Sequence, residues 1–292
     1  MAQILSSASA LLGRYDVLFC DVWGVLHNGV SEYEAAGDAL ERYRAAGGVV
    51  VLVSNAPIPA ATVETLLANK LVRTSAWDAI VTSGDVARTH IGDRGYFRIH
   101  HIGQDRDLSL YDGLSSQHVG IDDAEAIVCT GLVDDRRETG EDYRDRLRAA
   151  AERRLPFVCA NPDLVVDVGG RSLPCAGQVA QVYQSLRGPV YWAGKPHRAI
   201  YKVAMATAKR VRGPNLVKSR ILAIGDSFAT DLFGAREFGI DALFITSGIH
   251  RAEFHGADND PVVDGSLDPA KLDRALRGAE LFPVGASTAL AW

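Results

Sequence analysis

The sequence VLFCDVWGVL, residues 17–26, decides how this chain is interpreted. Its first four residues form a short apolar run, which is typical of a buried strand. The run ends at Asp21, and the residues that follow are typical of a turn from a strand into a loop. The pattern predicts that Asp21 presents its carboxylate at the end of a strand.

Outward from this stretch, short apolar runs alternate with helical patterns along most of the chain. This alternation predicts βαβ units and a largely parallel sheet, so the expected fold class is α/β. Helices are expected at residues 35–43, 62–70, 197–210 and 231–238. The apolar runs are Val17–Cys20, Val49–Val53, Ala79–Thr82, Val190–Trp192, Ile221–Ile224 and Ala242–Ile245.

The middle of the chain, residues 95–189, is predicted to be an inserted cap domain. It holds a highly charged helical pattern at Glu141–Arg154 and further strand candidates, and connections longer than about 15 residues usually carry structure or function. The core is then formed by residues 1–94 and 190–292, and the tail Gly285–Ala289 is expected to be loosely ordered. The strand candidates are Phe97–Ile102, Ala126–Thr130 and Phe157–Ala160.

Composition limits the partners that the protein is expected to have. The 31 Lys and Arg residues and the 36 Asp and Glu residues are spread along the chain, and the net charge is −5, so no basic patch for nucleic acid or membrane is predicted. The N-terminus lacks a signal-peptide pattern, and no apolar stretch is long enough to span a membrane. A cytoplasmic protein is expected. The four cysteines show no C-x-x-C spacing and are predicted to be buried thiols.

Polar residues follow several of the predicted strands, at the edge where open parallel sheets bind their ligands. Together they supply a carboxylate, a hydroxyl, a cation and further acidic groups, which is the set that phosphoryl transfer requires. Mg²⁺ suits this set because it prefers hard oxygen ligands, and a carboxylate nucleophile would form an aspartyl-phosphate. The residues are Asp21, Ser54, Asn55, Lys195, Asp226 and Asp231.

The order of these segments resembles the four motifs of the haloacid dehalogenase (HAD) superfamily, and the resemblance covers nearly the whole chain. The matching segments are Asp21-x-x-Gly-Val-Leu, Val51-Leu52-Val53-Ser54-Asn55, Gly194-Lys195-Pro196 and Ile224-Gly225-Asp226-Ser227-x-x-Thr230-Asp231. The cap between the second and third motifs, with Asn161-Pro162-Asp163 near its end and Pro174-Cys175-Ala176-Gly177 after it, is similar to subfamily IIA. That branch contains NagD-like nucleotide phosphatases, nitrophenyl phosphatases and pyridoxal phosphatase. The resemblance implies a Rossmann-like core with a C2-type cap.

The resemblance also implies the residues of a Mg²⁺ site. Asp21 would be both the nucleophile and a metal ligand, and Asp226 would be a second ligand. Asp231 would act through the water shell of the metal. The remaining ligand would be the backbone carbonyl of Trp23, which does not depend on the side chain at that position.

The same resemblance implies the residues that handle the phosphoryl group of the substrate. Ser54 would donate a hydrogen bond to the group, with Asn55 contributing beside it. Lys195 would hold the charge of the nucleophile and the phosphate. The activity implied is Mg²⁺-dependent hydrolysis of a small phosphate monoester.

Trp23 departs from the pattern of the resembling phosphatases, which carry a second aspartate at this position. That aspartate protonates the leaving oxygen and then activates water, and an indole can do neither. General acid–base catalysis typically contributes about 10² to 10⁴ in rate, so its loss would slow turnover and leave phosphate binding intact. The indole either packs under the cap or stacks on an aromatic leaving group.

Three interpretations of this departure stay open. The substrate could leave without assistance, as aryl and acyl phosphates do. Another group could replace the missing acid, and the candidates are His27, Asp163 and Asp167. Alternatively, the protein is a catalytically impaired sensor or binding protein for a phosphorylated ligand.

Substrate contacts are expected in the cap segment from Asn161 through Asp163 to Arg171, where Arg171 could meet an anionic substituent. The expected partner is a small phosphorylated metabolite. Caps in similar proteins can mediate dimerisation, so a homodimer through the cap is an open expectation.

Overall fold

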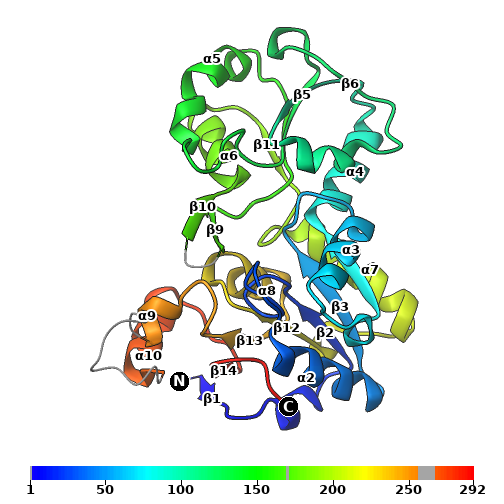
Figure 1. Cartoon of the computed structure of the whole chain (residues 1–292), viewed down its shortest axis with the longest axis vertical. Coiled ribbons are helices and arrows are strands. Elements are labelled where there is room, and N and C mark those ends of the chain that lie inside the picture. The colour runs from blue at the N-terminus through cyan, green and yellow to red at the C-terminus, as the bar shows by residue number, and fades with distance from the viewer. Residues whose placement is uncertain (1, 169–170, 256–266) are drawn as a thin grey trace. The chain divides into compact units, whose positions relative to one another are not determined.

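The computed structural model describes residues 2–168, 171–255 and 267–292 of the 292-residue chain. Over these ranges the chain forms two compact units (Figure 1). The first unit consists of Met1–Val53, Leu66–Ile80 and Ala204–Trp292. The second unit consists of Ser54–Thr65 and Val81–Val203.

The described strands form a seven-stranded sheet, here called the first sheet, in the order β1-β14-β13-β12-β2-β3-β4. The pairings from β1 through β3 are all parallel. The central strands β2, β3 and β12 are buried along their whole length, which explains their continuous apolar sequences. The strands are β1 (Gln3–Ile4), β2 (Val17–Cys20), β3 (Val49–Ser54), β4 (Ala79–Thr82), β12 (Ile221–Gly225), β13 (Asp241–Ile245) and β14 (Gly285–Ser287).

The register of the central strands aligns the ends that carry polar residues. Cys20 of β2 pairs with Ile224 of β12, and the Asp21 N–H donates to the Ile224 carbonyl oxygen over 2.8 Å. Because the two strands are parallel, the residues that follow them leave the sheet at the same edge. This register places Asp21 beside the loop that begins at Asp226.

Helices and short helical turns connect the strands. The α-helices are α1 (Ser9–Leu12), α2 (Glu34–Ala45), α3 (Ala60–Asn69), α4 (Ser83–Arg94), α5 (Arg144–Glu152), α6 (Ala176–Ser185), α7 (Arg198–Arg212), α8 (Phe233–Phe238), α9 (Arg251–His255) and α10 (Pro269–Gly278). The 3-10 turns are η1 (Thr74–Ala76), η2 (Asp105–Tyr111), η3 (Ile121–Asp123), η4 (Gly140–Tyr143) and η5 (Lys218–Arg220). A π-helical turn, η6 (Phe228–Leu232), precedes α8.

Two expectations for the C-terminal half need correction. The helix expected at residues 231–238 begins earlier, because η6 runs directly into α8, and it ends at Gly239 in the left-handed conformation. The tail at Gly285–Ala289 is not loosely ordered. Its first three residues form β14, which is buried and pairs with β13 and β1.

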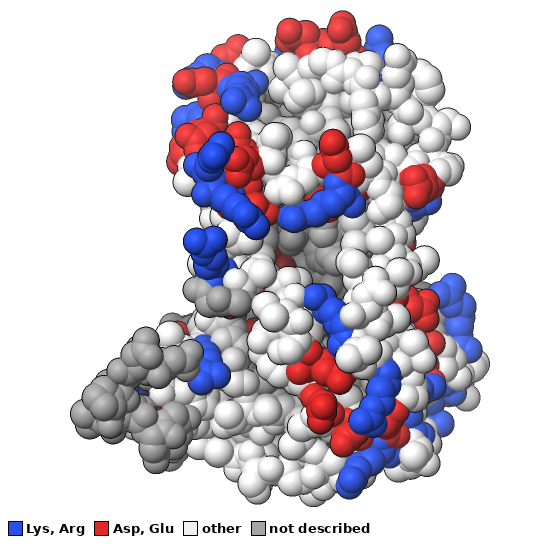
Figure 2. Space-filling view, in the orientation of Figure 1, with Lys and Arg blue, Asp and Glu red and all other residues white. Residues whose placement is uncertain are grey.

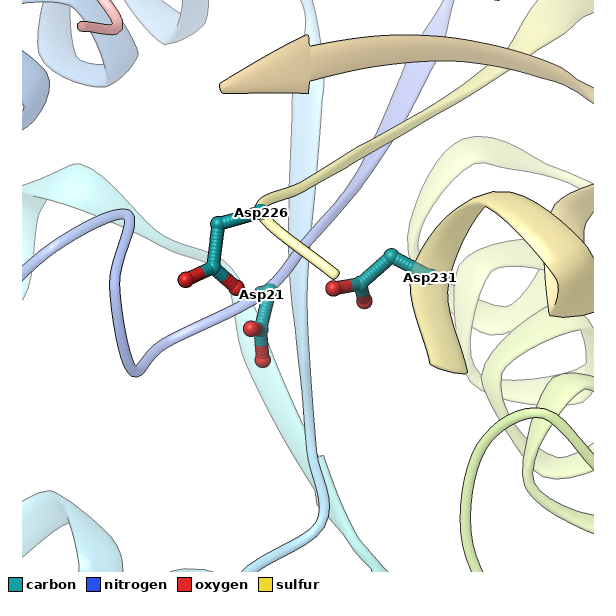
Figure 3. Close-up of side chains that lie close together, drawn as sticks. All are labelled: Asp21, Asp226 and Asp231. Carbon is teal, nitrogen blue, oxygen red and sulfur yellow. The ribbon is translucent and has the colours of Figure 1, made fainter. Parts of the chain in front are cut away.

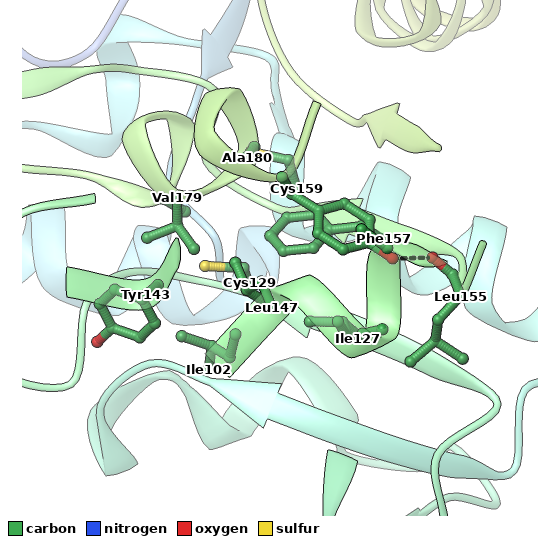
Figure 4. Close-up of a cluster of buried hydrophobic side chains, with 14 of the residues drawn as sticks. Ile102, Ile127, Cys129, Tyr143, Leu147, Leu155, Phe157, Cys159, Val179 and Ala180 are labelled. Carbon is green, nitrogen blue, oxygen red and sulfur yellow. Dashed lines mark hydrogen bonds between the residues drawn. The ribbon is translucent and has the colours of Figure 1, made fainter. Parts of the chain in front are cut away.

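The second unit contains a five-stranded parallel sheet among its described residues, here called the second sheet, in the order β11-β8-β7-β5-β6. Its hydrophobic core lies against α5 and α6 and includes Ile127, Phe157 and Val179 (Figure 4). A two-stranded antiparallel hairpin joins β8 to α6. The strands are β5 (Arg98–Ile102), β6 (Gln117–His118), β7 (Ala126–Cys129), β8 (Phe157–Cys159), β9 (Val165–Val168), β10 (Arg171–Pro174) and β11 (Val190–Trp192).

The α/β class with a largely parallel sheet is confirmed, and so is each predicted strand run. Val190–Trp192, which was predicted as a strand of the core, lies in the second unit and pairs with β8 in the second sheet. The predicted cap, residues 95–189, falls within the second unit, which also holds Ser54–Thr65. The domain boundaries at 94 and 190 stay a prediction.

Two predictions from composition can be compared with the structure. All four cysteines are buried thiols, as predicted. Lys and Arg side chains are interspersed with Asp and Glu over the face shown in Figure 2. Arg148 pairs with Asp145 within α5, and Arg144 at the start of α5 pairs with Glu141 of η4. Within the described residues, no helix is both long and apolar enough to cross a membrane.

Candidate active site

Three buried carboxylates of the first unit converge at one edge of the first sheet (Figure 3). Asp21 follows β2, Asp226 follows β12, and Asp231 lies in η6. One oxygen from each carboxylate lies within 4.8 Å of the others, so the three side chains can share a single ion. The sequence predicted all three residues, and the structure brings them together.

Two glycines fix the carboxylate of Asp226. A Cβ atom on Gly24 would lie 2.0 Å from Asp226 Oδ2, and a Cβ on Gly248 would lie 1.9 Å from the same oxygen. Gly24 also has φ = +79°, a conformation that side chains other than glycine rarely adopt. The Ile249 N–H donates to Asp226 Oδ2 over 2.7 Å. The carboxylate is therefore held between two backbone segments that leave no room for side chains.

Gly248 and Ile249 were missed in the sequence. They lie beyond the apolar run Ala242–Ile245, at the same strand edge as the predicted residues. Their position after a predicted strand was therefore a sequence feature that could have indicated a place in the site. Neither residue carries a polar side chain, so a pattern of reactive side chains does not reveal them. Ile249 acts through its backbone N–H, and Gly248 acts through its lack of a side chain.

Asp231 is fixed in a similar way. A Cβ on Gly225 would lie 2.1 Å from Asp231 Cγ, so the glycine before Asp226 is needed for this close approach. The Ser227 N–H donates to Asp231 Oδ2 over 3.2 Å, and the Ser227 hydroxyl accepts from the Thr230 N–H over 3.4 Å. The segment from Gly225 to Asp231 is thus a compact turn that aims its second carboxylate back toward its first.

The donor set fits a hard divalent cation. Three buried carboxylates this close repel one another, and burial adds a desolvation penalty for each charge. A cation among them offsets both effects, and oxygen donors of this kind suit Mg²⁺. The backbone carbonyl of Trp23 as a further ligand stays a prediction.

The side chain of Trp23 packs within its own loop. Its ring meets the His27 ring edge to face, with 4.8 Å between centroids and 70° between planes. A Cβ on Gly29, which has φ = +87°, would lie 2.5 Å from Trp23 Cζ2. The indole therefore contacts both Gly29 and His27, and the glycine makes room for it.

His27 is poorly suited to replace the missing acid. The side chain is 4% exposed, and its Nδ1 accepts from the Gly29 N–H over 2.9 Å, which assigns the proton of the neutral ring to Nε2. Burial, and to a lesser extent the charge of Lys70, lowers the pKa of His27 to about 4. At neutral pH the ring is uncharged and the lone pair of Nδ1 is engaged, so it is neither an acid for the leaving oxygen nor an effective base.

The predicted phosphate residues belong to the second unit. The Ser54 hydroxyl is buried and accepts from the Ala56 N–H over 3.2 Å, which leaves its proton to donate elsewhere. Asn55 donates to Asp163 Oδ1 over 2.8 Å and to the Lys195 carbonyl oxygen over 3.1 Å. The Lys195 N–H donates to Asn55 Oδ1 over 2.7 Å. Asn55, Asp163 and Lys195 are thus joined, although they come from three distant segments.

The remaining cap residues are spread along the segment that leads into the hairpin. Asn161 Oδ1 accepts from the Asp163 N–H over 3.1 Å, which forms a tight turn after β8. Asp167 is exposed on β9, and Arg171 is exposed at the start of β10. The roles of Asn161, Asp163 and Arg171 in substrate specificity stay predictions.

The chain is similar in sequence and fold to several known proteins. The haloacid dehalogenase-like hydrolase family matches residues 18–115, and the HAD-hydrolase-like family matches residues 192–268. A crystal structure of a haloacid dehalogenase-like hydrolase from Brucella suis is 43% identical, with a TM-score of 0.84 and full coverage of both chains. The 5′-nucleotidase YutF of Bacillus subtilis is 26% identical over 252 residues, covering 82% of this chain and 90% of the relative.

A more distant structure shows the same fold with a bound metal. Glycerol phosphate phosphatase from Mycobacterium tuberculosis in complex with magnesium is 21% identical, with a TM-score of 0.63 over 90% of this chain and 75% of that one. The four motifs, the convergence of the three carboxylates and the full-length similarity to the Brucella protein lead to one assignment. This chain belongs to the haloacid dehalogenase-like hydrolases.

Proposed function

We propose that the protein is a phosphatase of subfamily IIA that hydrolyses a small phosphate monoester through an aspartyl-phosphate on Asp21, with Mg²⁺ as its cofactor. The observation that carries this proposal is the convergence of Asp21, Asp226 and Asp231 at the end of β2. A nucleophilic carboxylate beside two further acidic groups suits metal-assisted phosphoryl transfer and has little purpose in a reaction without a metal.

The steps follow from the residues of this chain. One oxygen of Asp21 attacks phosphorus, the bond to the leaving oxygen breaks, and the leaving group departs with the electron pair. Water then attacks the phosphorus of the aspartyl-phosphate, which releases phosphate and restores Asp21. Mg²⁺ bound by Asp21 and Asp226 would neutralise charge on the phosphoryl oxygens. Ser54 and Lys195 keep the roles of hydroxyl donor and cation toward the same group.

In this proposal the leaving group departs as an anion, because no side chain protonates its oxygen. In the described part of the loop after Asp21, Trp23 replaces the acid and His27 is neutral with a low pKa, so neither provides a proton at pH 7. We therefore propose that the substrate has a leaving group of low pKa, such as an aryl or acyl phosphate. The relatives named above are a 5′-nucleotidase and a glycerol phosphate phosphatase, so the substrate class is proposed to be a small phosphorylated metabolite, while the preference for a leaving group of low pKa rests on the loop after Asp21 alone.

A series of aryl phosphates with different leaving-group pKa values tests this proposal. The logarithm of kcat/KM, which reports the step in which the leaving group departs, should fall steeply as the leaving-group pKa rises, because no side chain protonates the departing oxygen. A flat dependence would show that an unrecognised acid assists. Asp21→Asn should abolish turnover, and activity that survives in this variant would overturn the nucleophile assignment.

A second candidate function is a sensor that binds or retains a phosphoryl group. The engaged Nδ1 of His27 favours it, because the same lack of a base slows attack of water on the aspartyl-phosphate. Incubation with Mg²⁺ and acetyl phosphate, followed by intact mass measurement, separates the two. A stable phospho-adduct with slow release supports the sensor, and release of phosphate without accumulation supports the phosphatase.

A further inference from the structure

The side chain of Asn55 forms a buried hydrogen-bond junction with the backbone of Lys195 and the carboxylate of Asp163. Asn55 is 5% exposed and Lys195 is 3% exposed. The partners of Asn55 lie 108 and 140 residues away in sequence. The junction therefore joins the segment after β3, the turn after β8 and the segment before α7 within the second unit.

The orientation of the Asn55 amide follows from its partners. The Lys195 N–H can only donate, so the atom that faces it must be the amide oxygen. The Asp163 carboxylate and the Lys195 carbonyl can only accept, so both must face the amide nitrogen. Both N–H groups and the oxygen of Asn55 are thus engaged by the protein itself.

Glycines and a serine hold the segments around this junction closely together. A Cβ on Gly194 would lie 2.2 Å from Asn55 Oδ1 and 2.7 Å from Pro162 Cδ. A Cβ on Gly177 would lie 2.4 Å from the carbonyl oxygens of Pro162 and Asp163. The Ser83 hydroxyl donates to the Ala160 carbonyl oxygen. The backbone before and after Asp163 is therefore fixed from several sides, and Gly194 has no room for a side chain.

We infer that Asn55 is a positioning residue, which sets the backbone of Lys195 and couples it to Asp163 of the cap segment, and that Asn55 does not bind the phosphoryl group. This inference rests on the proposed function, because Lys195 is the cation assigned to the phosphate. It also gives Asp163 a role in holding Asn55. The placement of the Lys195 ammonium then depends on the turn after β8.

A reciprocal exchange of the two side chains tests the inference. Asn55→Asp replaces both amide donors with a carboxylate oxygen that faces Asp163 and the Lys195 carbonyl, so kcat for p-nitrophenyl phosphate should fall at least tenfold. Asp163→Asn alone, whose introduced amide can still accept from Asn55, is the second single variant with which the double variant is compared. In the double variant the introduced amide donates to the introduced carboxylate, so the part of the loss that comes from the contact with position 163 should be recovered, while the Lys195 carbonyl oxygen still lacks its donor.

Each result of the exchange decides between two roles for Asn55. If Asn55 touches the phosphoryl group, the new carboxylate repels phosphate whatever stands at position 163, and the double variant stays as impaired as Asn55→Asp. That outcome would overturn the inference. Recovery of kcat in the double variant, with KM near the wild-type value, supports it. Asn215→Asp, which makes the same chemical change at an exposed position, should leave kcat unchanged.

A readout without turnover separates this inference from the proposed function. The affinity for inorganic phosphate in the presence of Mg²⁺, measured by calorimetry, should fall in Asn55→Asp and recover in the double variant. If the wild type binds phosphate and hydrolyses no ester, the proposed function fails while the exchange still tests the junction. The thermal midpoint of the double variant should exceed that of Asn55→Asp. A double variant no more stable than Asn55→Asp, and no better at binding phosphate, refutes the junction.

Discussion

At the residue scale, Trp23 decides how fast the proposed chemistry can run. We expect Trp23→Asp to raise kcat for alkyl phosphates by about 10² or more, because it restores a carboxyl group that can transfer a proton. Trp23→Ala is the matched control, since it removes the same contacts with His27 and Gly29 and adds no acid. Steady-state rates on an alkyl and an aryl phosphate measure the effect. Equal rates for the two variants would show that proton transfer does not limit the reaction.

Gly248 tests the geometry of the metal site at the same scale. A methyl group at this position would lie 1.9 Å from Asp226 Oδ2, so Gly248→Ala must displace the carboxylate. We expect the affinity for Mg²⁺ to fall at least tenfold, as measured by calorimetric titration. Gly37→Ala is the control, because a Cβ there has no neighbour within 4 Å and alanine favours the surrounding helix. Unchanged Mg²⁺ affinity in Gly248→Ala would contradict the assignment of Asp226 as a ligand.

The predicted site residues differ in how readily sequence reasoning could find their contacts. Asp21 and Asp226 each follow a continuous apolar strand, so their positions at one sheet edge follow from the alternation of strands and helices. The contact between Asn55 and Asp163 joins residues 108 positions apart and depends on the packing of the second unit. No local pattern encodes such a contact, so the engagement of the Asn55 amide could not be predicted.

At the element scale, β14 shows where tertiary contacts override local preference. Its residues Gly285, Ala286 and Ser287 have little preference for strands, and the sequence therefore predicted a loose tail. The strand forms because β13 and β1 supply pairing on both sides, and the Ser287 hydroxyl donates to the Leu5 carbonyl oxygen over 3.0 Å. The strands β2 and β3 were predicted correctly, because they are buried along their whole length and burial requires the continuous apolar sequence from which they were recognised.

The segment after β14 should contribute measurably to stability. Leu290 is 1% exposed, so Leu290→Ala should lower the free energy of unfolding by about 2–5 kcal/mol. Phe282→Ala is the control, because Phe282 is 78% exposed and precedes the strand. Chemical denaturation monitored by circular dichroism compares the two. Equal losses of stability would show that the buried position of Leu290 is wrong.

At the scale of the whole molecule, the buried His27 and the half-buried His101 make stability depend on pH. Burial is the main cause that lowers the pKa of His27 in the first unit and of His101 in the second unit, each to about 4. An unfolded histidine has a pKa near 6.5, so between about pH 6.5 and 4 the unfolded chain binds protons that the folded chain does not. Stability therefore falls as the pH is lowered through this window, by roughly 1–2 kcal/mol for each group at pH 5.

Asp16 affects stability at lower pH than the two histidines, so the contribution of the histidines can be measured separately. Hydrogen bonds from Arg220 and Arg212 lower the pKa of Asp16 to about 2, so its contribution is complete above about pH 5 and is lost only as the pH falls toward 2. We expect the thermal midpoint of the wild type to drop by several degrees from pH 8 to pH 5. The drop should be smaller in His27→Gln and in His101→Gln, and smallest in the double variant. The decrease of the midpoint between pH 8 and pH 5 is compared, and not the midpoint itself, because a packing defect in a variant lowers the midpoint at both pH values. If the double variant shows the same decrease as the wild type, the acid sensitivity arises elsewhere in the chain.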